Sequence, residues 1–397
     1  MILSDVCEFI VDCPHSTAPD EGKGYPLIRT PNVGKGRLDL NGVHRVSESV
    51  YKQRIQRGTP RANDLIFARE APAGNVALVQ ENQTVCLGQR TVLIRPNVQK
   101  VNPQYLVYYL LSPKPQYELL GTANGATVAH VNLPAIRNLK IELPEKSVQD
   151  KIGTILVTYD DLIENNQKQI KLLEEAARRL YKEWFVDLNF PGHENTKIVD
   201  GVPEGWQYEK LGDLVKTTSG GTPSRRKSEY YVNGNIRWIK TKELNDRFIF
   251  ETEEHITEDA VKNSSAKVLP EGALIVAMYG ATIGKIGITA AEMACNQACC
   301  AFISFDDMIS KEYLYCWLMD NREYLVSQGK GAAQSNLSQE MIRNFSLLCP
   351  DKKVIKNFTE IVTTMLENKR VLENKILMLS KARDDLLPKL MSGEVEV

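Results

Sequence analysis

Residues 144–185 read PEKSVQDKIGTILVTYDDLIENNQKQIKLLEEAARRLYKEWF, and residues 350–391 repeat the pattern of this stretch. Apolar side chains recur in both at alternating spacings of three and four, which is typical of a helix that packs lengthwise on another helix. At ~1.5 Å per residue, a helix of about 40 residues extends for ~60 Å, more than a globular domain needs. We therefore predict two long helices that pair with each other. The alternative is two ordinary surface helices, each buried in its own domain.

The predicted seam is apolar with few exceptions. Asn166 is the polar residue in the seam of the first helix, and Lys369 and Arg383 are the polar residues in the seam of the second. The positions expected to form the helix-pair interface are Ile152, Leu156, Ile163, Ile170, Leu173, Leu180, Trp184, Phe358, Val362, Leu372, Ile376, Leu379 and Leu386.

An offset of 206 residues (350 − 144) between the two stretches indicates a duplicated unit. The apolar run DLIFA at 64–68 matches ALIVA at 273–277, as expected of strands buried on both faces. Gly74 and Gly284 lie at matching places in the loops that follow. We predict an α+β fold with two mixed α/β domains in a pseudo-two-fold repeat, separated by two long antiparallel coiled-coil helices. The expected segments are a domain at 1–144, a helix at 145–190, a linker at 191–205, a domain at 206–348 and a helix at 349–392.

The composition is that of an ordinary soluble protein, and 397 residues exceed what one hydrophobic core usually supports. No apolar run reaches the ~18 residues of a membrane span, and the N-terminus lacks the features of a signal peptide. The eight cysteines have no framework spacing and are interpreted as reduced thiols. Cys295, Cys299 and Cys300 fit small apolar packing better than a zinc site. These features predict a cytoplasmic protein that does not enter a membrane.

The net charge of −1 does not by itself indicate a nucleic-acid partner. Residues 1–144 carry 16 Lys and Arg against 12 Asp and Glu, whereas residues 206–348 carry 16 against 18. A protein that holds DNA alone usually has a stronger basic excess. If this chain binds DNA, its basic groups are locally focused or partner subunits supply much of the phosphate contact.

No catalytic or metal-ligating pattern is evident. The segment Gly280–Lys285, GATIGK, resembles a phosphate-binding loop, but it has three residues between the glycines and Ile286 where Ser or Thr must bind magnesium. A tight loop that carries Tyr279, Thr282 and Lys285 to a surface is the better interpretation. No methyltransferase, nuclease, Cys-His or Ser-His motif appears, so we predict a non-catalytic chain without a metal or cofactor of its own.

The loops of both copies are dense in hydrogen-bond donors. Arg and Lys suit guanine, Asn and Gln suit adenine, and Ser and Thr suit phosphates or bases. Each residue alone is more often a loop-solvating side chain, but the recurrence in both copies favours a DNA-reading group. The candidates in the first copy are Arg29, Thr30, Asn32, Arg69, Asn75, Gln89, Arg90, Asn124 and His130. Those in the second copy are Thr218, Ser219, Arg225, Lys240, Tyr279, Thr282, Lys285, Asn296, Gln297, Lys330 and Asn336.

Several segments together resemble the DNA-specificity subunits of Type I restriction–modification systems, over essentially the whole chain. They are CPHSTAPDEGKGYPLIRT at 13–30, TSGGTPSRRKSEYYVNGNIRWIKT at 218–241, MYGATIGK at 278–285, PEKSVQDKIGTIL at 144–156, LYKEWFVDLNFPG at 180–192 and VPEGW at 202–206.

The resemblance implies two target-recognition domains, each reading half of an interrupted double-stranded DNA sequence. It implies long helices that set the half-site separation and hold two methyltransferase subunits, with restriction subunits where these are present. The methyltransferase subunits are expected to use S-adenosylmethionine. Two alternatives are a scaffold whose helices and globular ends bind only proteins, and a DNA-modifying enzyme with an unrecognised site. Salt-dependent DNA binding would distinguish the scaffold from the DNA reader.

Overall fold

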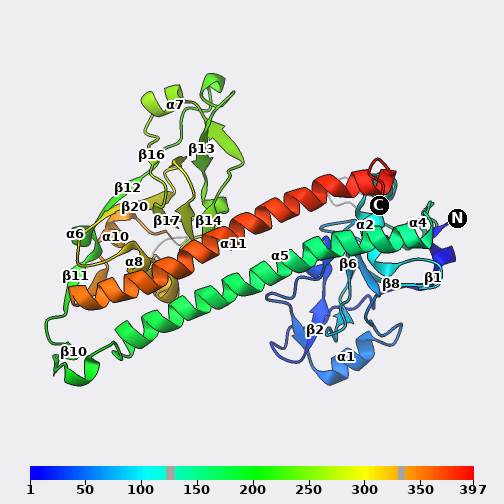
Figure 1. Ribbon diagram of the computed structural model, residues 1–397, viewed down its shortest axis with the longest axis horizontal. Helices are drawn as coiled ribbons and strands as arrows, with labels where there is room; N and C mark the ends of the chain where they lie inside the picture. Colours follow the sequence, from blue (N-terminus) through cyan, green and yellow to red (C-terminus); the bar gives the residue numbers. More distant parts are fainter. Residues whose placement is uncertain (122–129, 330–335) are drawn as a thin grey trace. The chain divides into compact units, whose positions relative to one another are not determined.

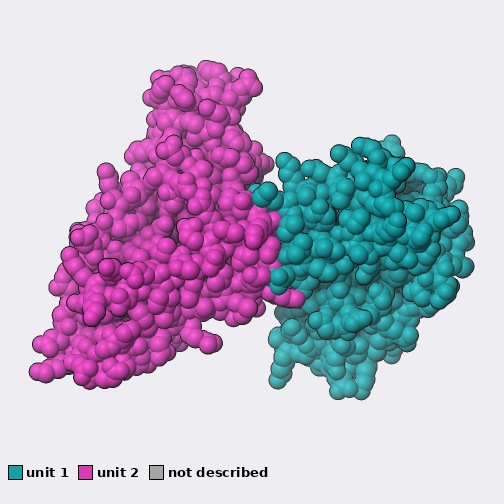
Figure 2. Space-filling view, in the orientation of Figure 1, with its two compact units in different colours: residues 1–165, 377–397 teal, residues 166–376 magenta. Residues whose placement is uncertain are grey.

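The structure is a computed structural model in which residues 1–121, 130–329 and 336–397 are described. The chain divides into two compact units (Figures 1 and 2). Unit 1 contains Met1–Asn165 and Leu377–Val397, and unit 2 contains Asn166–Ile376. Each unit thus combines one globular portion with part of each long helix.

Unit 1 is built on a five-stranded and a three-stranded sheet. The larger sheet has the order β1 (Cys7–Asp12), β8 (Thr91–Pro96), β5 (Leu65–Ala68), β6 (Val76–Leu78) and β3 (Gly36–Arg37). The smaller sheet has the order β4 (Arg45–Val46), β2 (Tyr25–Ile28) and β7 (Cys86–Leu87). The connecting helices are η1 (Leu3–Val6), η2 (Thr30–Asn32), α1 (Glu48–Arg54), α2 (Pro103–Leu111), α3 (Pro113–Gly121) and α4 (Leu133–Arg137).

Unit 2 repeats this arrangement. Its five-stranded sheet has the order β12 (Val215–Ser219), β20 (Cys299–Phe305), β17 (Leu274–Ala277), β18 (Ile286–Thr289) and β14 (Arg247–Ile249). A second sheet has the order β15 (Glu254–Ile256), β13 (Ile236–Ile239), β19 (Met293–Cys295) and β16 (Val268–Leu269), and β11 (Gln207–Lys210) pairs with β21 (Ser346–Cys349). Its connecting helices are α6 (Leu211–Leu214), η5 (Ser228–Tyr230), η6 (Thr241–Glu243), α7 (Glu258–Lys262), α8 (Lys311–Asp320), α9 (Arg322–Gln328) and α10 (Gln339–Arg343).

The predicted duplication is confirmed by the matching order of the two five-stranded sheets. Both edge strands β3 and β14 run parallel to their neighbours β6 and β18, whereas the other neighbours in these sheets are antiparallel. Gly74 and Gly284 take positive φ angles of 89° and 77°, which glycine adopts without steric cost. Their N–H groups donate to Ala68 O at 3.0 Å and to Ala277 O at 2.9 Å.

The central strands β5 and β17 are buried on both faces, as their apolar sequences predict. Leu65 and Phe67 belong to one core cluster of unit 1, and Ile66 and Ala68 belong to another. Successive side chains of a strand point to opposite faces, so the strand must be covered on both sides. The residues of β17 divide between two clusters of unit 2 in the same way.

The two predicted long helices are α5 (Lys146–Tyr181) and α11 (Lys352–Ser392). A π-helical turn, η3 (Lys182–Val186), continues α5. The helices begin two residues after Pro144 and Pro350. The linker forms η4 (His193–Asn195) and a short hairpin of β9 (Ile198–Val199) and β10 (Val202–Pro203). Most of the linker is exposed.

The two basic residues of the predicted seam, Lys369 and Arg383, form ion pairs with carboxylates of α5. In unit 1, Arg383 contacts the buried carboxylate of Asp160, which also accepts a hydrogen bond from Tyr108 Oη at 2.6 Å. In unit 2, Lys369 Nζ lies 2.6 Å from Glu174 Oε1. The position advances from 160 to 174 along α5 while it falls from 383 to 369 along α11, so the helices are antiparallel. Each step is 14 residues (174 − 160 and 383 − 369), or two heptads.

The apolar seam positions differ in burial. Ile152 and Leu156 belong to a core cluster of unit 1, and Phe358 and Val362 belong to one of unit 2. The other buried seam residues are Ile163, Trp184 and Leu372. The half-buried seam residues are Ile170, Leu173, Leu180, Ile376, Leu379 and Leu386.

Candidate nucleic-acid interface

The loop that follows β5 carries Arg69, which is held on all sides by unit 1. Its Nε donates to Val131 O at 2.9 Å and its Nη1 donates to Asp12 Oδ2 at 2.6 Å. Its Nη2 lies 2.7 Å from His130 Nε2. Arg69 is only 9% exposed, so its guanidinium mainly holds the loop and its neighbours in place.

Glu70, the next residue, joins this arrangement to an exposed arginine. Its carboxylate lies 2.5 Å from His130 Nδ1 and contacts Arg90, whose side chain is 62% exposed. Arg90 takes a positive φ of 64°, which turns the chain sharply before β8. Beside it, Gln89 Nε2 donates to His15 O at 2.5 Å. We call the five residues Asp12, Arg69, Glu70, Arg90 and His130 the first ionic cluster.

The same scaffold in unit 2 carries uncharged residues at matching positions. In unit 1, Arg69 N–H donates to Arg90 O at 2.9 Å. In unit 2, Met278 N–H donates to Ala298 O at 2.8 Å. Met278 therefore takes the place of Arg69, and Ala298 takes the place of Arg90.

A second pair of positions shows the same exchange. The N–H of Val131 donates to Arg69 O at 3.0 Å, and that of Leu337 donates to Met278 O at 2.7 Å. The residues before them, His130 and Asn336, thus correspond. Asn336 forms a backbone bridge to Tyr279, which replaces Glu70. Corresponding loops of the two units share a backbone arrangement but differ in chemistry.

Unit 2 has an ionic group of its own next to β13. Glu254 Oε2 lies 2.6 Å from Arg225 Nη2, and Lys240 Nζ lies 2.5 Å from Glu254 Oε1. The Arg225 guanidinium carbon lies 4.3 Å from the ring centre of Tyr231 and 5.2 Å from that of Trp238. These contacts hold two of the predicted cations, Arg225 and Lys240, close together.

A second ionic group of unit 2 lies under the loop at 280–285. Lys285 Nζ donates to Asp246 Oδ2 at 2.8 Å, and Arg322 donates to Asp246 and to Gly284 O. Burial alone would raise the pKa of Asp246, but the hydrogen bond from Lys285 and the charge of Arg322 outweigh it and hold that pKa below its usual value. The Lys285 side chain remains 40% exposed. Thr282 Oγ1 anchors the same loop by donating to Thr241 O at 2.8 Å.

Two predicted residues of unit 1 lie in the turn after β2 and are buried. Asn32 Oδ1 accepts a hydrogen bond from Arg29 N–H at 3.1 Å, and Asn32 Nδ2 donates to Asp39 O at 3.2 Å. Thr30 is 9% exposed. In unit 2, Glu243 accepts from Lys240 N–H in the same way, at 2.6 Å. The geometry gives Asn32 a structural contact, and a base contact by this residue stays a prediction.

The remaining predicted residues are distributed over other loops and strands. Asn75 Nδ2 donates to Val33 O at 2.9 Å, and Asn296 Oδ1 accepts from Ala298 N–H at 3.1 Å. Gln297 is exposed and accepts from Thr222. Thr218 and Ser219 lie on β12, where Ser219 Oγ donates to Gln339 Oε1 at 3.0 Å. Asn124 and Lys330 lie outside the described residues.

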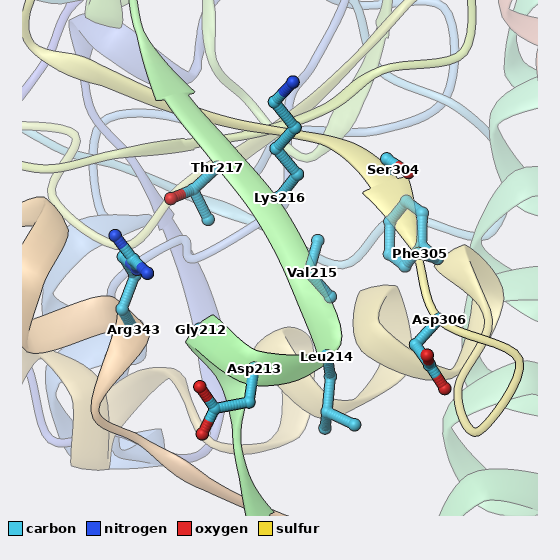
Figure 3. Close-up of a pocket in the computed structure, with 10 residues that line it drawn as sticks. All are labelled: Gly212, Asp213, Leu214, Val215, Lys216, Thr217, Ser304, Phe305, Asp306 and Arg343. Atoms are coloured by element: carbon cyan, nitrogen blue, oxygen red, sulfur yellow. The ribbon is translucent and has the colours of Figure 1, made fainter.

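A polar hollow of about 440 Å³ lies beside α6 and β12 (Figure 3). Its cationic lining residues, Lys216 and Arg343, are balanced by Asp213 and Asp306. Because the two signs of charge are equal in number, this hollow offers no preference for a phosphate. Of the residues predicted to read DNA, none lines it among the described residues.

The acidic partners in these groups were not anticipated from the sequence. Asp12, Glu70, Asp246 and Glu254 position the predicted cations and contact them directly. Of these four, only Glu70 could have been suspected from the sequence, because it directly follows the predicted residue Arg69. Within the described ranges, no group of three or more His, Cys, Asp or Glu residues could hold a metal ion. No helix in this part of the chain is long and apolar enough to cross a membrane.

Comparison with known proteins explains the repeated scaffold. The family model described as Type I restriction modification DNA specificity domain matches residues 1–175 and again 203–378. The chain belongs to this family of DNA specificity domains. It is accordingly a non-catalytic DNA-recognition subunit of the Type I kind, and subunits of this kind work with DNA and with methylation and restriction subunits.

Individual relatives extend over most of the specificity subunit. The Type I restriction enzyme MjaIX specificity subunit of Methanocaldococcus jannaschii is 28% identical over 363 residues, covering 90% of this chain and 83% of that protein. The HindI specificity subunit of Haemophilus influenzae is 24% identical, covering 87% and 88%. A crystal structure of a Type I S subunit from M. genitalium has the same fold, with a TM-score of 0.62 at 15% identity, covering 98% of this chain and 95% of that one.

Proposed function

We propose that each unit of this specificity subunit reads one half of a bipartite, interrupted DNA sequence. The observation that carries this proposal is the exchange of the first ionic cluster of unit 1 for uncharged residues on the matching backbone of unit 2. Sequence is read through the hydrogen-bonding pattern of base edges, so two loops with different donors suit two different half-sites.

In unit 1, Arg90 has the geometry expected of a guanine reader. One edge of its guanidinium contacts Glu70, and its exposed side chain leaves other N–H groups for a bidentate contact with guanine O6 and N7. Glu70 is itself 13% exposed and contacts His130, so Arg90 is restrained before DNA arrives. A restrained side chain loses less entropy on binding.

In unit 2, the exposed loops offer amides, a phenol and a lysine. Gln297 occupies the place of Gln89, and its amide N–H groups suit adenine. Tyr279, Lys285 and Asn336 are further candidates in unit 2, where a hydrogen bond to Asp246 restrains Lys285.

The chain is proposed to direct partners to the DNA that it reads. We infer two methyltransferase subunits that methylate adenine with S-adenosylmethionine, and restriction subunits where these are present. The basic excess of this chain is small, so these partners would supply part of the contact with the phosphates. A cytoplasmic location follows from this role and stays a prediction.

Methylation mapping tests the proposal. The chain is produced with its methyltransferase partner in a host without other adenine methylation, and methylated adenines are located by sequencing. We expect one interrupted consensus with two defined halves. Arg90→Ala should relax one or two bases of one half only, by a factor of roughly 10 to 100, because a bidentate contact contributes ~1–3 kcal/mol of discrimination.

Arg61→Ala is the matched control, since Arg61 is also an exposed arginine of unit 1 but lies outside the cluster. It should leave the consensus unchanged. A continuous consensus, or relaxation of both halves by Arg90→Ala, would contradict the assignment of one half-site to each unit. Absence of salt-dependent DNA binding by the assembled complex would favour a protein-binding scaffold.

A further inference from the structure

Unit 1 contains an apolar groove of about 1000 Å³ between the beginning of α5 and the segment that ends α11. Tyr105 and Tyr109 of α2 and Ile152 of α5 form one side of it, and residues 388–397 form the other. Tyr105, Tyr109 and Ile152 are buried in the core of unit 1, so this side of the groove is rigid.

The matching place in unit 2 is filled by aromatic rings. Tyr313 corresponds to Tyr105, and Phe358 corresponds to Ile152. Phe185 packs on both, with ring centres 4.8 Å from Tyr313 and 4.9 Å from Phe358. Trp206 lies against Phe185 at 5.9 Å. The space that is open in unit 1 is therefore closed in unit 2 by side chains from the linker and the end of α5.

The outer layer of this filling comes from the two residues that flank the linker. Phe190 precedes it and Trp206 follows it, with ring centres 4.7 Å apart and exposures of 4% and 5%. Between them the chain is mostly exposed. The linker thus covers unit 2 through a few aromatic anchors.

The end of α11 in unit 1 has smaller side chains than the end of α5 and η3 in unit 2. At the repeat offset of 206 residues, Leu390 and Met391 stand where unit 2 has Trp184 and Phe185. Phenylalanine and tryptophan bury more surface than leucine and methionine, so the replacement leaves the groove unfilled. Across the groove, unit 1 also has an aliphatic residue, Ile152, at the position where unit 2 has Phe358.

We propose that this groove of unit 1 binds an extended segment of a partner protein that presents a phenylalanine or tryptophan side chain. The filled counterpart in unit 2 specifies the occupant, because the sheet and helices around the groove are duplicated while Leu390 and Met391 replace the rings of Trp184 and Phe185. An aromatic anchor in an apolar pocket, flanked by segments that contribute little, is the usual form of such a contact.

The chain's own linker supplies the probe. A labelled peptide of residues 184–206, WFVDLNFPGHENTKIVDGVPEGW, is titrated with the intact chain, and binding is followed by fluorescence anisotropy. We expect saturable binding that falls at least tenfold when the aromatic residues of the peptide are replaced by alanine. Val148→Glu, which places a charge in the lining of the groove, should weaken binding to the same extent.

Two further variants make the result decisive. Lys151→Glu places the same glutamate side chain on an exposed position of the same helix, outside the groove lining, and changes the net charge by two units instead of one. It should nevertheless bind the peptide normally. Ile152→Phe restores the ring that unit 2 has and should weaken binding by filling the groove, whether or not Val148→Glu folds.

Failure of the peptide to bind, or equal binding by the groove and control variants, would overturn the proposal. Sedimentation of the chain alone tests whether a second copy of the chain occupies the groove instead of a partner protein. Dimerisation that Ile152→Phe abolishes would assign the groove to a second copy of the chain instead of a partner protein.

Discussion

Lys369 is a buried cation whose removal should destabilise unit 2. Its side chain is 1% exposed, and its Nζ lies 2.6 Å from Glu174 Oε1. It also donates to Asp246 O at 2.5 Å and to Tyr315 Oη at 3.0 Å. Removing one partner of a buried ion pair costs about 3–5 kcal/mol, because the groups left behind stay desolvated. We predict that Lys369→Met lowers the free energy of unfolding of unit 2 by about this amount at pH 8.

The cost should depend on pH through Glu373, which lies one turn along α11. Burial raises the pKa of Glu373 to about 7, and the charge of Lys369 opposes this rise. A carboxyl group whose pKa is raised by folding holds more protons in the folded state, so stability falls as pH rises from the unfolded pKa to the folded one. Without Lys369 the pKa of Glu373 rises further and the loss extends above pH 7. Lys369→Met should therefore cost less at pH 5 than at pH 8.

Tryptophan fluorescence measures this effect in the right unit. The four tryptophans of the chain all lie in unit 2, at Trp184, Trp206, Trp238 and Trp317. Urea unfolding is followed at pH 5 and pH 8 for the wild type, for Lys369→Met and for the control Lys375→Met, which removes an exposed lysine of α11. Adding Glu373→Gln to Lys369→Met should recover part of the stability at pH 8. A cost below ~1 kcal/mol, or the same cost at both pH values, would refute the reasoning.

Three other substitutions or rearrangements have defined outcomes. Glu373→Gln alone keeps a side-chain oxygen that accepts from Phe248 N–H. It should raise the free energy of unfolding of unit 2 above pH 7 by up to ~3 kcal/mol and remove the pH dependence of that free energy between pH 4.5 and 7, measured in the same urea assay. A fragment of residues 1–190 should form a homodimer that directs methylation to an interrupted palindrome, and Ala177→Arg should tighten it. In the intact chain Arg383 of α11 pairs with Asp160 of α5, and position 177 of α5 corresponds to position 383 at the repeat offset. An arginine at position 177 of one copy therefore lies opposite Asp160 of the other copy. Sedimentation of the fragment as a stable monomer would contradict this prediction. Joining the two chain ends and opening a new end within Gly192–Asn195 should preserve methylation, because both present ends lie near residues 141–142. Ile141 N–H donates to Met1 O, and residues 388–397 line the same groove as Glu142. Loss of methylation in a folded permutant would count against this prediction.

The architecture followed from patterns that are local in the chain. Periodicity of three and four predicted α5 and α11, and the offset between them predicted a duplicated unit, which the structure contains as two copies of one sheet order. The apolar runs of β5 and β17 predicted strands covered on both faces. Such patterns can be recognised in the sequence alone, because the burial of a helix or strand depends on which of its own residues face the core.

The tertiary structure decided what the polar residues do. Asp160 and Arg383 are 223 positions apart, and neither spacing nor periodicity indicates that the arginine in the seam has a partner. Asn32 and Arg69 have the donors of base readers, yet contacts with Arg29 N–H, Asp12 and His130 fix them inside unit 1. Composition tells which side chains can hydrogen-bond. Only the folded chain sets which are already satisfied, because donors and acceptors far apart in sequence meet through the packing of the sheets and helices.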